Sequence, residues 1–411
     1  MDRRVFLGAA PLSAFAFQPA QAAATVAAGP VLAGPPVVQH PGPRGFTIAF
    51  ALGGLATGWV EWGLAPDQLD RQVIPRRGGL IDASDRALAV RVELDDPISA
   101  DQPIYYRVAA QGLAYRNAYQ LTRAEPEFGA IQSLRLPKTD SESFLLAMVN
   151  DTHENSETLS QLHATLERLE PDALLWCGDT CNDFDAADHP EQVTLAPLGQ
   201  RDSGWASRWP LLFVPGNHDV RGQRARELHD CLPGWPGQAD LPYCQAVRLG
   251  PIGLVMLDTG EDKPDRHPVF AGTAAYEPYR KAQTEWLREA LASPAMATAP
   301  FKIAACHIPL RGVPGESDGT TLEGYANHCG DAARQWLPVL AEHGVRLVLS
   351  GHTHSTRIDD PTPEMPVMQV VGGGPRPAAA SLTTLHATPE RLVLSIEHLN
   401  GDEWMRREFR A

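Results

Sequence analysis

The run FLLAMV at residues 144–149 is wholly apolar and stops abruptly at the polar cluster NDTH, residues 150–153. The same pairing recurs further along the chain. Residues 173–177 end at Gly178-Asp179, residues 211–214 at the cluster PGNHD, residues 301–306 at His307, and residues 345–349 at the cluster SGHTH. Apolar runs without alternation are typical of strands buried on both faces. The second part of the chain therefore reads as a series of buried strands, each ending in polar residues.

Helical patterns lie between these runs. Leu159, Leu162, Leu166 and Leu169 form one stripe, which Asn155 or Ser156 would cap and Pro171 would stop. A second helix is expected over about residues 279–292. Strands that alternate with helices predict an α/β layered domain, in which ligands gather beyond the carboxyl ends of the strands. All the polar clusters fall at that end, so we expect them to converge.

The clusters supply seven metal-ligand side chains, namely Asp151, His153, Asp179, Asn217, His307, His352 and His354. Their oxygen and imidazole donors suit Zn, Mn, Fe or Co better than Ca or a thiolate-type zinc site. Seven donors exceed the needs of one tetrahedral ion and are about right for two ions sharing a carboxylate. Two ions about 3.5–4 Å apart are the arrangement that clamps a phosphoryl group during in-line attack.

These motifs also carry a family resemblance. Asp-x-His, Gly-Asp-x-x-x-Asp, Gly-Asn-His-Asp, a lone His and Gly-His-x-His occur in this order over roughly residues 143–375. The set resembles the calcineurin-like metallophosphoesterase superfamily, whose catalytic fold is a β-sandwich flanked by helices. The resemblance implies one metal held by Asp151, His153, Asp179 and His354, and a second held by Asp179, Asn217, His307 and His352.

The resemblance also implies that His218 is no ligand but faces the substrate. Asp183 matches the second aspartate of the Gly-Asp motif and would orient His218, with Asp185 and Asp219 as rivals for that role. Hydroxide formed between the two ions would attack phosphorus, and His218 would protonate the leaving alcohol as general acid. The positive charge of the metal centre would attract a small phosphoester locally, although the chain carries −15 overall.

Three functions fit these observations. A phosphomonoesterase is expected first. A phosphodiesterase acting on nucleotides or lipid headgroups is the alternative, because the same metal site serves both reactions. A non-catalytic binding or scaffold protein on the same fold is the third, and degenerate ligands would mark it; none of the motifs is degenerate.

The region before residue 140 has a different pattern. Over residues 37–125, short alternating runs between Gly/Pro turns predict an all-β sandwich. The sequences GWVEWG (58–63) and YYRV (105–108) resemble the fibronectin type III-like domain that precedes the catalytic domain of purple acid phosphatases. Residues 23–36 read as a linker, and residues 140–411 as the catalytic domain. Trp59 and Trp62 are either a ligand platform or packing residues.

One departure from purple acid phosphatases concerns their metal-binding tyrosine, three residues after the Gly-Asp aspartate. Asn182 stands at that position here, so the tyrosine–iron chromophore is expected to be absent.

The first 22 residues resemble a secretory signal. Arg3-Arg4 precede an apolar run to about Phe17, and residues 20–22 offer a small-x-small cleavage site. We therefore expect twin-arginine export to the periplasm or the exterior. The apolar run is too short to span a membrane, and no other segment approaches about 20 apolar residues. The net charge of −15 argues against general nucleic-acid binding.

Other residues allow weaker expectations. Cys231 and Cys244 flank a Pro/Gly-rich loop and are the best pair for a disulfide, with free thiols as the equal alternative. Arg201, Arg208, Arg221 and Lys263 lie in expected rim loops, where each is either a phosphate ligand or a solvated charge. Residues 372–374, Gly-Gly-Gly, are expected to form a turn closing the site.

Overall fold

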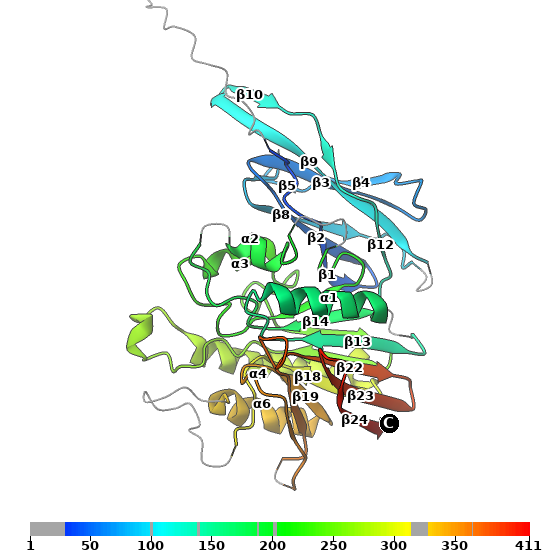
Figure 1. Ribbon diagram of the computed structural model, residues 1–411, viewed down its shortest axis with the longest axis vertical. Helices are drawn as coiled ribbons and strands as arrows, with labels where there is room; N and C mark the ends of the chain where they lie inside the picture. The colour runs from blue at the N-terminus through cyan, green and yellow to red at the C-terminus, as the bar shows by residue number, and fades with distance from the viewer. Residues whose placement is uncertain are drawn as a thin grey trace, which may run out of the picture.

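The computed structural model describes residues 29–98, 102–137, 140–186, 189–199, 204–313, 328–363 and 365–411. The expected signal segment, residues 1–22, and Arg201 lie outside them. Two sheets stack face to face in the catalytic region, and helices cover their outer faces (Figure 1).

The larger sheet has nine strands in the order β24-β23-β22-β13-β14-β15-β1-β2-β8. Its parallel centre is β13 (Phe144–Val149), β14 (Ala173–Cys177) and β15 (Leu211–Val214). On one side it continues through antiparallel β22 (Ser381–Ala387), β23 (Arg391–His398) and β24 (Glu403–Arg410). On the other side lie β1 (Val37–Gly42), β2 (Gly45–Ala51) and β8 (Ala87–Glu93).

The smaller sheet has six strands in the order β16-β17-β18-β19-β21-β20. They are β16 (Gln245–Leu249), β17 (Ile252–Met256), β18 (Phe301–Ala305), β19 (Leu347–Ser350), β21 (Met368–Val371) and β20 (Arg357–Asp359). Leu146 and Leu175 of the larger sheet share one buried core with Leu254 and Ile303 of the smaller. The apolar runs lack alternation because each strand packs on this core and also on a helical layer.

Two helical layers complete the catalytic region. Helix α1 (Ser156–Leu169) packs Leu159, Leu162 and Leu166 into a core with Trp176 of β14. Its N-cap is Asn155, whose side chain accepts the Thr158 N–H at 3.0 Å, as the sequence predicted. Helices α4 (Tyr276–Ala292) and α6 (Gly330–Glu342) cover the smaller sheet. The short helical segments are α2 (His189–Thr194), η1 (Ala225–Glu227), α3 (Leu228–Cys231), η2 (Pro268–Phe270) and α5 (Pro294–Ala297).

The described residues from Val37 to Leu134 form strands and no helix, which makes an N-terminal all-β region plausible. Besides β1, β2 and β8, it contains β3 (Ala56–Gly63), β4 (Arg71–Val73), β5 (Arg76–Arg77), β6 (Leu80–Ile81), β7 (Ala83–Ser84), β9 (Ile104–Asn117), β10 (Gln120–Arg123), β11 (Glu127–Phe128) and β12 (Gln132–Leu134). Strand β9 pairs with β3 and with β10, β11 and β12, so the strands run past residue 125.

The N-terminal strands do not stand apart from the catalytic sheet. Strand β1 runs parallel to β15, with Gln39 opposite Leu211. Strand β2 is buried along its whole length: Ile48 packs into the N-terminal core, whereas Ala49 packs with Trp205 of the catalytic region. Small residues on the second face let the two parts approach closely.

The structure also bears on three further expectations, which concern the linker, the pair of tryptophans and the pair of cysteines. In the described part of the expected linker, Leu32 is buried and bridges to Leu52, so residues 31–36 lie against the strands, whereas residues 29–30 are exposed. Trp59 and Trp62 lie three residues apart in a strand and point to opposite faces, and Trp62 is buried, so they form no common platform.

Of the two alternatives for Cys231 and Cys244, the structure shows free thiols and no disulfide between them. All six cysteines are free and buried, and burial raises the pKa of Cys231 and Cys244, which disfavours the thiolate that disulfide exchange requires. None of the helices in the described ranges is long and apolar enough to cross a membrane.

Candidate metal centre

The seven expected ligands lie together where strands of both sheets end. Asp151 and His153 follow β13, Asp179 follows β14, and Asn217 follows β15; His307 follows β18, and His352 and His354 follow β19. The stacking of the two sheets therefore brings their polar ends to one place, as the sequence predicted from the position of each cluster.

The backbone at these positions is unusual. Among the described non-glycine residues, positive φ angles occur at Asp151 (48°), His153 (43°), Asp179 (52°), His352 (73°) and His354 (55°), at Glu154 next to His153, and at three residues elsewhere. Such conformations cost of order 1–3 kcal/mol each and persist where the surroundings fix them. Their concentration at one cluster indicates a constellation built for a function.

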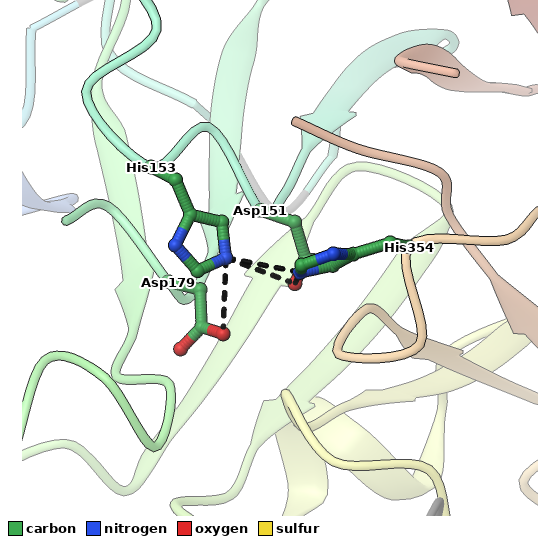
Figure 2. Close-up of side chains that lie close together, drawn as sticks. All are labelled: Asp151, His153, Asp179 and His354. Atoms are coloured by element: carbon green, nitrogen blue, oxygen red, sulfur yellow. Dashed lines mark hydrogen bonds and ion pairs between the residues drawn. The ribbon is translucent and has the colours of Figure 1, made fainter. Parts of the chain in front are cut away.

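The first group of donors is Asp151, His153, Asp179 and His354 (Figure 2). Nε2 of His153 lies 3.0 Å from Nε2 of His354 and 3.5 Å from Oδ2 of Asp179. Nε2 of His354 lies 3.4 Å from Oδ1 of Asp151. The four ligand atoms lie within 4.8 Å of one another, as donors around one ion would.

The second group is Asp179, His307 and His352. Nε2 of His307 lies 3.2 Å from Oδ2 of Asp179, the same oxygen that faces His153. Nδ1 of His352 lies 2.8 Å from the amide oxygen of Asn217, which adds a fourth donor. Asp179 is common to both groups, and its other oxygen, Oδ1, accepts the backbone N–H of His218 at 2.9 Å.

His307 shows that this centre is built for a cation. Its ring is fully buried, and Nδ1 lies 2.8 Å from the carbonyl oxygen of Cys177, which can only accept. Nε2 faces the carboxylates of Asp179 and Asp151 and has no hydrogen-bond partner in the part of the chain described. Burial lowers the pKa of His307, but these two carboxylates outweigh burial and raise the pKa to about 10. A positive charge is therefore favoured at Nε2, and a proton or a metal ion supplies it.

Asp219 ties two of the ligand loops together. Its Oδ2 accepts the backbone N–H groups of Gly216 at 2.7 Å and Asp179 at 2.8 Å. Its Oδ1 accepts the N–H of Thr180 at 3.0 Å and the Thr180 hydroxyl at 2.5 Å. Asp219 thus fixes the backbone that carries Asp179 and is not the carboxylate that orients His218.

His218 lies beside the first group, with its ring 4.9 Å from that of His153. Its Nδ1 donates to the carbonyl oxygen of Asn182 at 2.6 Å, and Nε2 accepts from the Arg221 guanidinium at 3.0 Å. Burial, and then the Arg221 charge, lower its pKa despite the opposing effect of Asp179.

The partner expected for His218 was the carboxylate of Asp183. Oδ1 of Asp183 instead accepts the backbone N–H of Asp185, and Oδ1 of Asp185 accepts that of Gln223. The partner of Nδ1 is therefore the backbone of Asn182, because the turn after β14 directs that carbonyl toward the ring.

The expected rim cations differ in their surroundings. Arg221 donates to both oxygens of Glu261 and to Asp262, and its side chain is 25% exposed, so it is a fixed part of the site wall. Lys263 pairs with Asp262 at 2.7 Å. Arg208 pairs with Glu170 on the surface, away from these residues.

Sequence reasoning missed the support that Asn150 gives to Asp151 and to the glycine run. Asn150 donates to Asp151 at 2.5 Å and to the carbonyl oxygen of Gly373 at 2.8 Å. A Cβ at Gly372 would come within 2.0 Å of the Asn150 amide, and one at Gly374 within 2.5 Å of Asp151. The glycine run closes the site, as expected from the sequence, because its backbone packs directly on the ligand loop.

The chain matches the family model for calcineurin-like phosphoesterases over residues 144–356, more than half of its length. It therefore belongs to the calcineurin-like phosphoesterase family. Membership places it in a class of phosphoesterases that typically bind two metal ions, in agreement with the His/Asp cluster.

The solved structures that resemble this chain are distant in sequence. GAP50, an inner-membrane-complex anchor of Plasmodium, is 13% identical, with a TM-score of 0.45 over 66% of this chain and 89% of that one. The E. coli phosphoesterase YfcE is 14% identical, with a TM-score of 0.28 over 64% and 98%. An archaeal phosphodiesterase is 10% identical, with a TM-score of 0.25 over 65% and 99%. No curated protein matched the sequence.

Proposed function

We propose that this protein hydrolyses phosphoric monoesters at a centre of two metal ions. The observation that carries the proposal is the pair of donor groups that share Asp179. Two groups with one common carboxylate oxygen suit two neighbouring ions, which is the arrangement used for phosphoryl transfer. Monoesters are placed first because the N-terminal sequence resembles the fibronectin type III-like domain of purple acid phosphatases.

The donor residues form two groups, one for each proposed ion. Asp151, His153, Asp179 and His354 would hold one ion, and Asp179, Asn217, His307 and His352 the other. The donor set suits Zn, Mn, Fe or Co. When bound, two such ions neutralise phosphate oxygens and lower the pKa of a water toward about 7. His307 is positioned by the Cys177 carbonyl and Asp151 by Asn150, so both ligands are held before any ion arrives.

His218 would give a proton to the leaving alcohol. The proton it transfers belongs on Nε2, because Nδ1 is committed to the Asn182 carbonyl. Arg221 donates to Nε2 in this arrangement, so the transfer requires that contact to be released. Asn182 and Arg221 together fix the plane of the ring beside the first donor group.

A paired assay on the mature protein tests this proposal. Metal content is measured by mass spectrometry, and turnover is compared on nitrophenyl phosphate and bis(nitrophenyl) phosphate. About two ions per chain and preference for the monoester are expected. Preference for the diester would replace the proposal by a phosphodiesterase. Absence of turnover with any of the four metals would instead favour a binding or scaffold protein.

The role of His218 needs its own variant. His218→Ala should keep its metal content and lose activity about 10²–10⁴-fold on esters with poor leaving groups. Activity on nitrophenyl phosphate should fall less, because nitrophenolate leaves without a proton. Unchanged turnover on alkyl esters would remove His218 from the mechanism.

We further propose export through a twin-arginine signal over residues 1–22, with cleavage after Ala22. Its test is the N-terminal sequence of the protein recovered outside the cytoplasm, where an intact Met1 would contradict it. The substrate is then a small phosphoester available in the periplasm or outside the cell.

A further inference from the structure

A cavity of about 670 Å³ is lined by Arg221, the residue that hydrogen-bonds to His218, and has no role in the proposed mechanism. It lies between the segment that follows β15 and the segment from Asp258 to Tyr279, which leads into α4. Its volume falls within the 300–1,000 Å³ typical of small-molecule sites. The cavity is therefore large enough for the organic part of a substrate.

Arg221 connects this cavity to the centre. It lines the cavity, and its guanidinium also donates to Nε2 of His218 at 3.0 Å. Two bonds to Glu261 hold the Arg221 side chain in this position. A phosphoester placed at the donor groups, with its leaving oxygen near His218, would direct its leaving group toward Arg221 and the cavity.

Aromatic rings line the cavity. His229 and Tyr243 stack with centroids 5.3 Å apart and an interplanar angle of 11°. Phe270 and Tyr276 meet edge to face at 6.3 Å. Gly260 lets the Tyr276 ring lie directly on its backbone, because a Cβ there would come within 2.2 Å of the ring. These rings are held by packing before a ligand arrives.

The polar groups of the wall are largely used within the protein. Asp258 is buried, accepts the Gly260 N–H at 2.7 Å and accepts the Tyr279 hydroxyl at 3.1 Å. Glu261 is paired with Arg221. The wall therefore offers mainly aromatic faces and short apolar side chains to a ligand, with the exposed Arg226 at its edge. Such a surface suits a planar ring better than a hydrated polyol.

We infer that this cavity binds the leaving group of the substrate and selects esters whose alcohol carries a planar aromatic ring, either a nucleoside or an aryl alcohol. The inference rests on the proposed phosphomonoesterase activity. Water adds to phosphorus, the bond between phosphorus and the ester oxygen breaks, and that oxygen takes a proton. The ring stays in the cavity until the alcohol leaves.

The first test compares adenosine 5′-monophosphate with ribose 5-phosphate, which has the same ester without the ring. Stacking on aromatic side chains is worth about 1–3 kcal/mol per base, or about 5–150-fold. We expect kcat/KM to be at least about 10-fold higher for the nucleotide. 1-Naphthyl phosphate provides the aryl arm. A higher kcat/KM than that of ribose 5-phosphate in either arm supports a ring-binding cavity, and the arm that shows it identifies the ring as that of a nucleoside or of an aryl alcohol. Equal kcat/KM for the nucleotide and ribose 5-phosphate, with no binding of 1-naphthol, would overturn the inference.

Two variants locate the effect. Phe270→Ala removes part of the aromatic wall, and Ala274→Trp fills the cavity. Both should lower kcat/KM for the preferred ring-bearing ester about 5–10-fold or more and leave ribose 5-phosphate within twofold. Tyr119→Ala is the matched control, since Tyr119 is 98% exposed on the distant β9–β10 hairpin. Equal losses on both substrates would show that the variants disturb the metal centre and would overturn the assignment.

A binding measurement separates this inference from the proposed function. Adenosine and 1-naphthol carry no phosphate and are titrated calorimetrically into protein stripped of metal by a chelator. We expect one of them to bind the wild type and the Tyr119→Ala variant, and to bind Ala274→Trp at least about 10-fold more weakly. If no ester is hydrolysed but this binding is found, the proposed function fails and the cavity assignment stands. If esters are hydrolysed and neither compound binds, the proposed function stands and the cavity assignment fails.

Discussion

Replacing Asp219 by asparagine tests whether one buried carboxylate holds the ligand loops in place. Its two oxygens accept four short hydrogen bonds, from Gly216, Asp179 and twice from Thr180, and one long bond from the Cys181 thiol at 3.9 Å. An amide has one oxygen. In the most favourable orientation of the amide, its oxygen still accepts the backbone N–H groups of Gly216 and Asp179. The Thr180 hydroxyl rotates so that its oxygen accepts a hydrogen bond from the amide NH₂ group. The backbone N–H of Thr180 then faces the amide NH₂ group and has no acceptor.

The cost follows from these contacts. One buried N–H without an acceptor costs about 1–3 kcal/mol, and two charge-assisted bonds that become neutral lose about 1 kcal/mol each. The variant should therefore be destabilised by about 3–5 kcal/mol, measured by urea unfolding at pH 8 with tryptophan fluorescence. Asp240→Asn, on the exposed surface, is the control and should change stability by less than about 0.5 kcal/mol.

The same variant reports on the centre, because Asp219 bonds to the backbone of Asp179, which belongs to both donor groups. Metal affinity should fall about 10–100-fold, as it does when a group supporting a ligand is removed. A variant within about 1 kcal/mol of the wild type, with unchanged metal affinity, would refute this account of how the loops are fixed.

Three further predictions test separate features. Asp179→Asn should leave less than one metal ion per chain, because both donor groups use Asp179, whereas His354→Ala should leave about one; equal losses by mass spectrometry would argue against sharing. Burial raises the pKa of Asp258 from 3.8 to about 6, so the folded chain holds this proton more tightly than the unfolded chain does. The free energy of unfolding therefore falls by about 3 kcal/mol as the pH rises from 4 to 8. Asp258→Asn should therefore be more stable than the wild type at pH 8 but not at pH 4, and parallel pH profiles of urea unfolding would contradict this. Gly216→Ala would place a Cβ 2.2 Å from Oδ1 of Asp179 and should weaken metal binding at least about 10-fold by calorimetry, whereas Gly29→Ala, with no atom nearby, should not.

The sequence sufficed for the catalytic strands and for the convergence of the ligands. Strands such as Phe144–Val149 are buried on both faces, so their apolar runs are unbroken, and each run ends where a polar side chain such as Asp151 is needed. Helix α1 could also be predicted from the sequence, because its leucine stripe and the Asn155 cap are local signals.

What the sequence could not provide depends on contacts between distant segments. The partner of His218 is a backbone carbonyl, at Asn182, and any residue type supplies one. The roles of Asp183 and Asp219 depended on loop geometry that spacing does not determine. The alternating runs over residues 37–125 predicted an all-β sandwich, but alternation alone does not show that Ala49, on the second face of β2, is buried against the catalytic region.

The parallel pairing of β1 with β15 has a consequence for any attempt to shorten the protein. A catalytic fragment that begins at residue 140 would leave the edge of β15 with unpaired backbone groups and would uncover Trp205, which packs on β2. Bare strand edges beside apolar surface recruit other chains. The N-terminal strands thus cover the edge of the catalytic sheet permanently, and an expression fragment designed at the apparent domain boundary is expected to aggregate through that exposed edge.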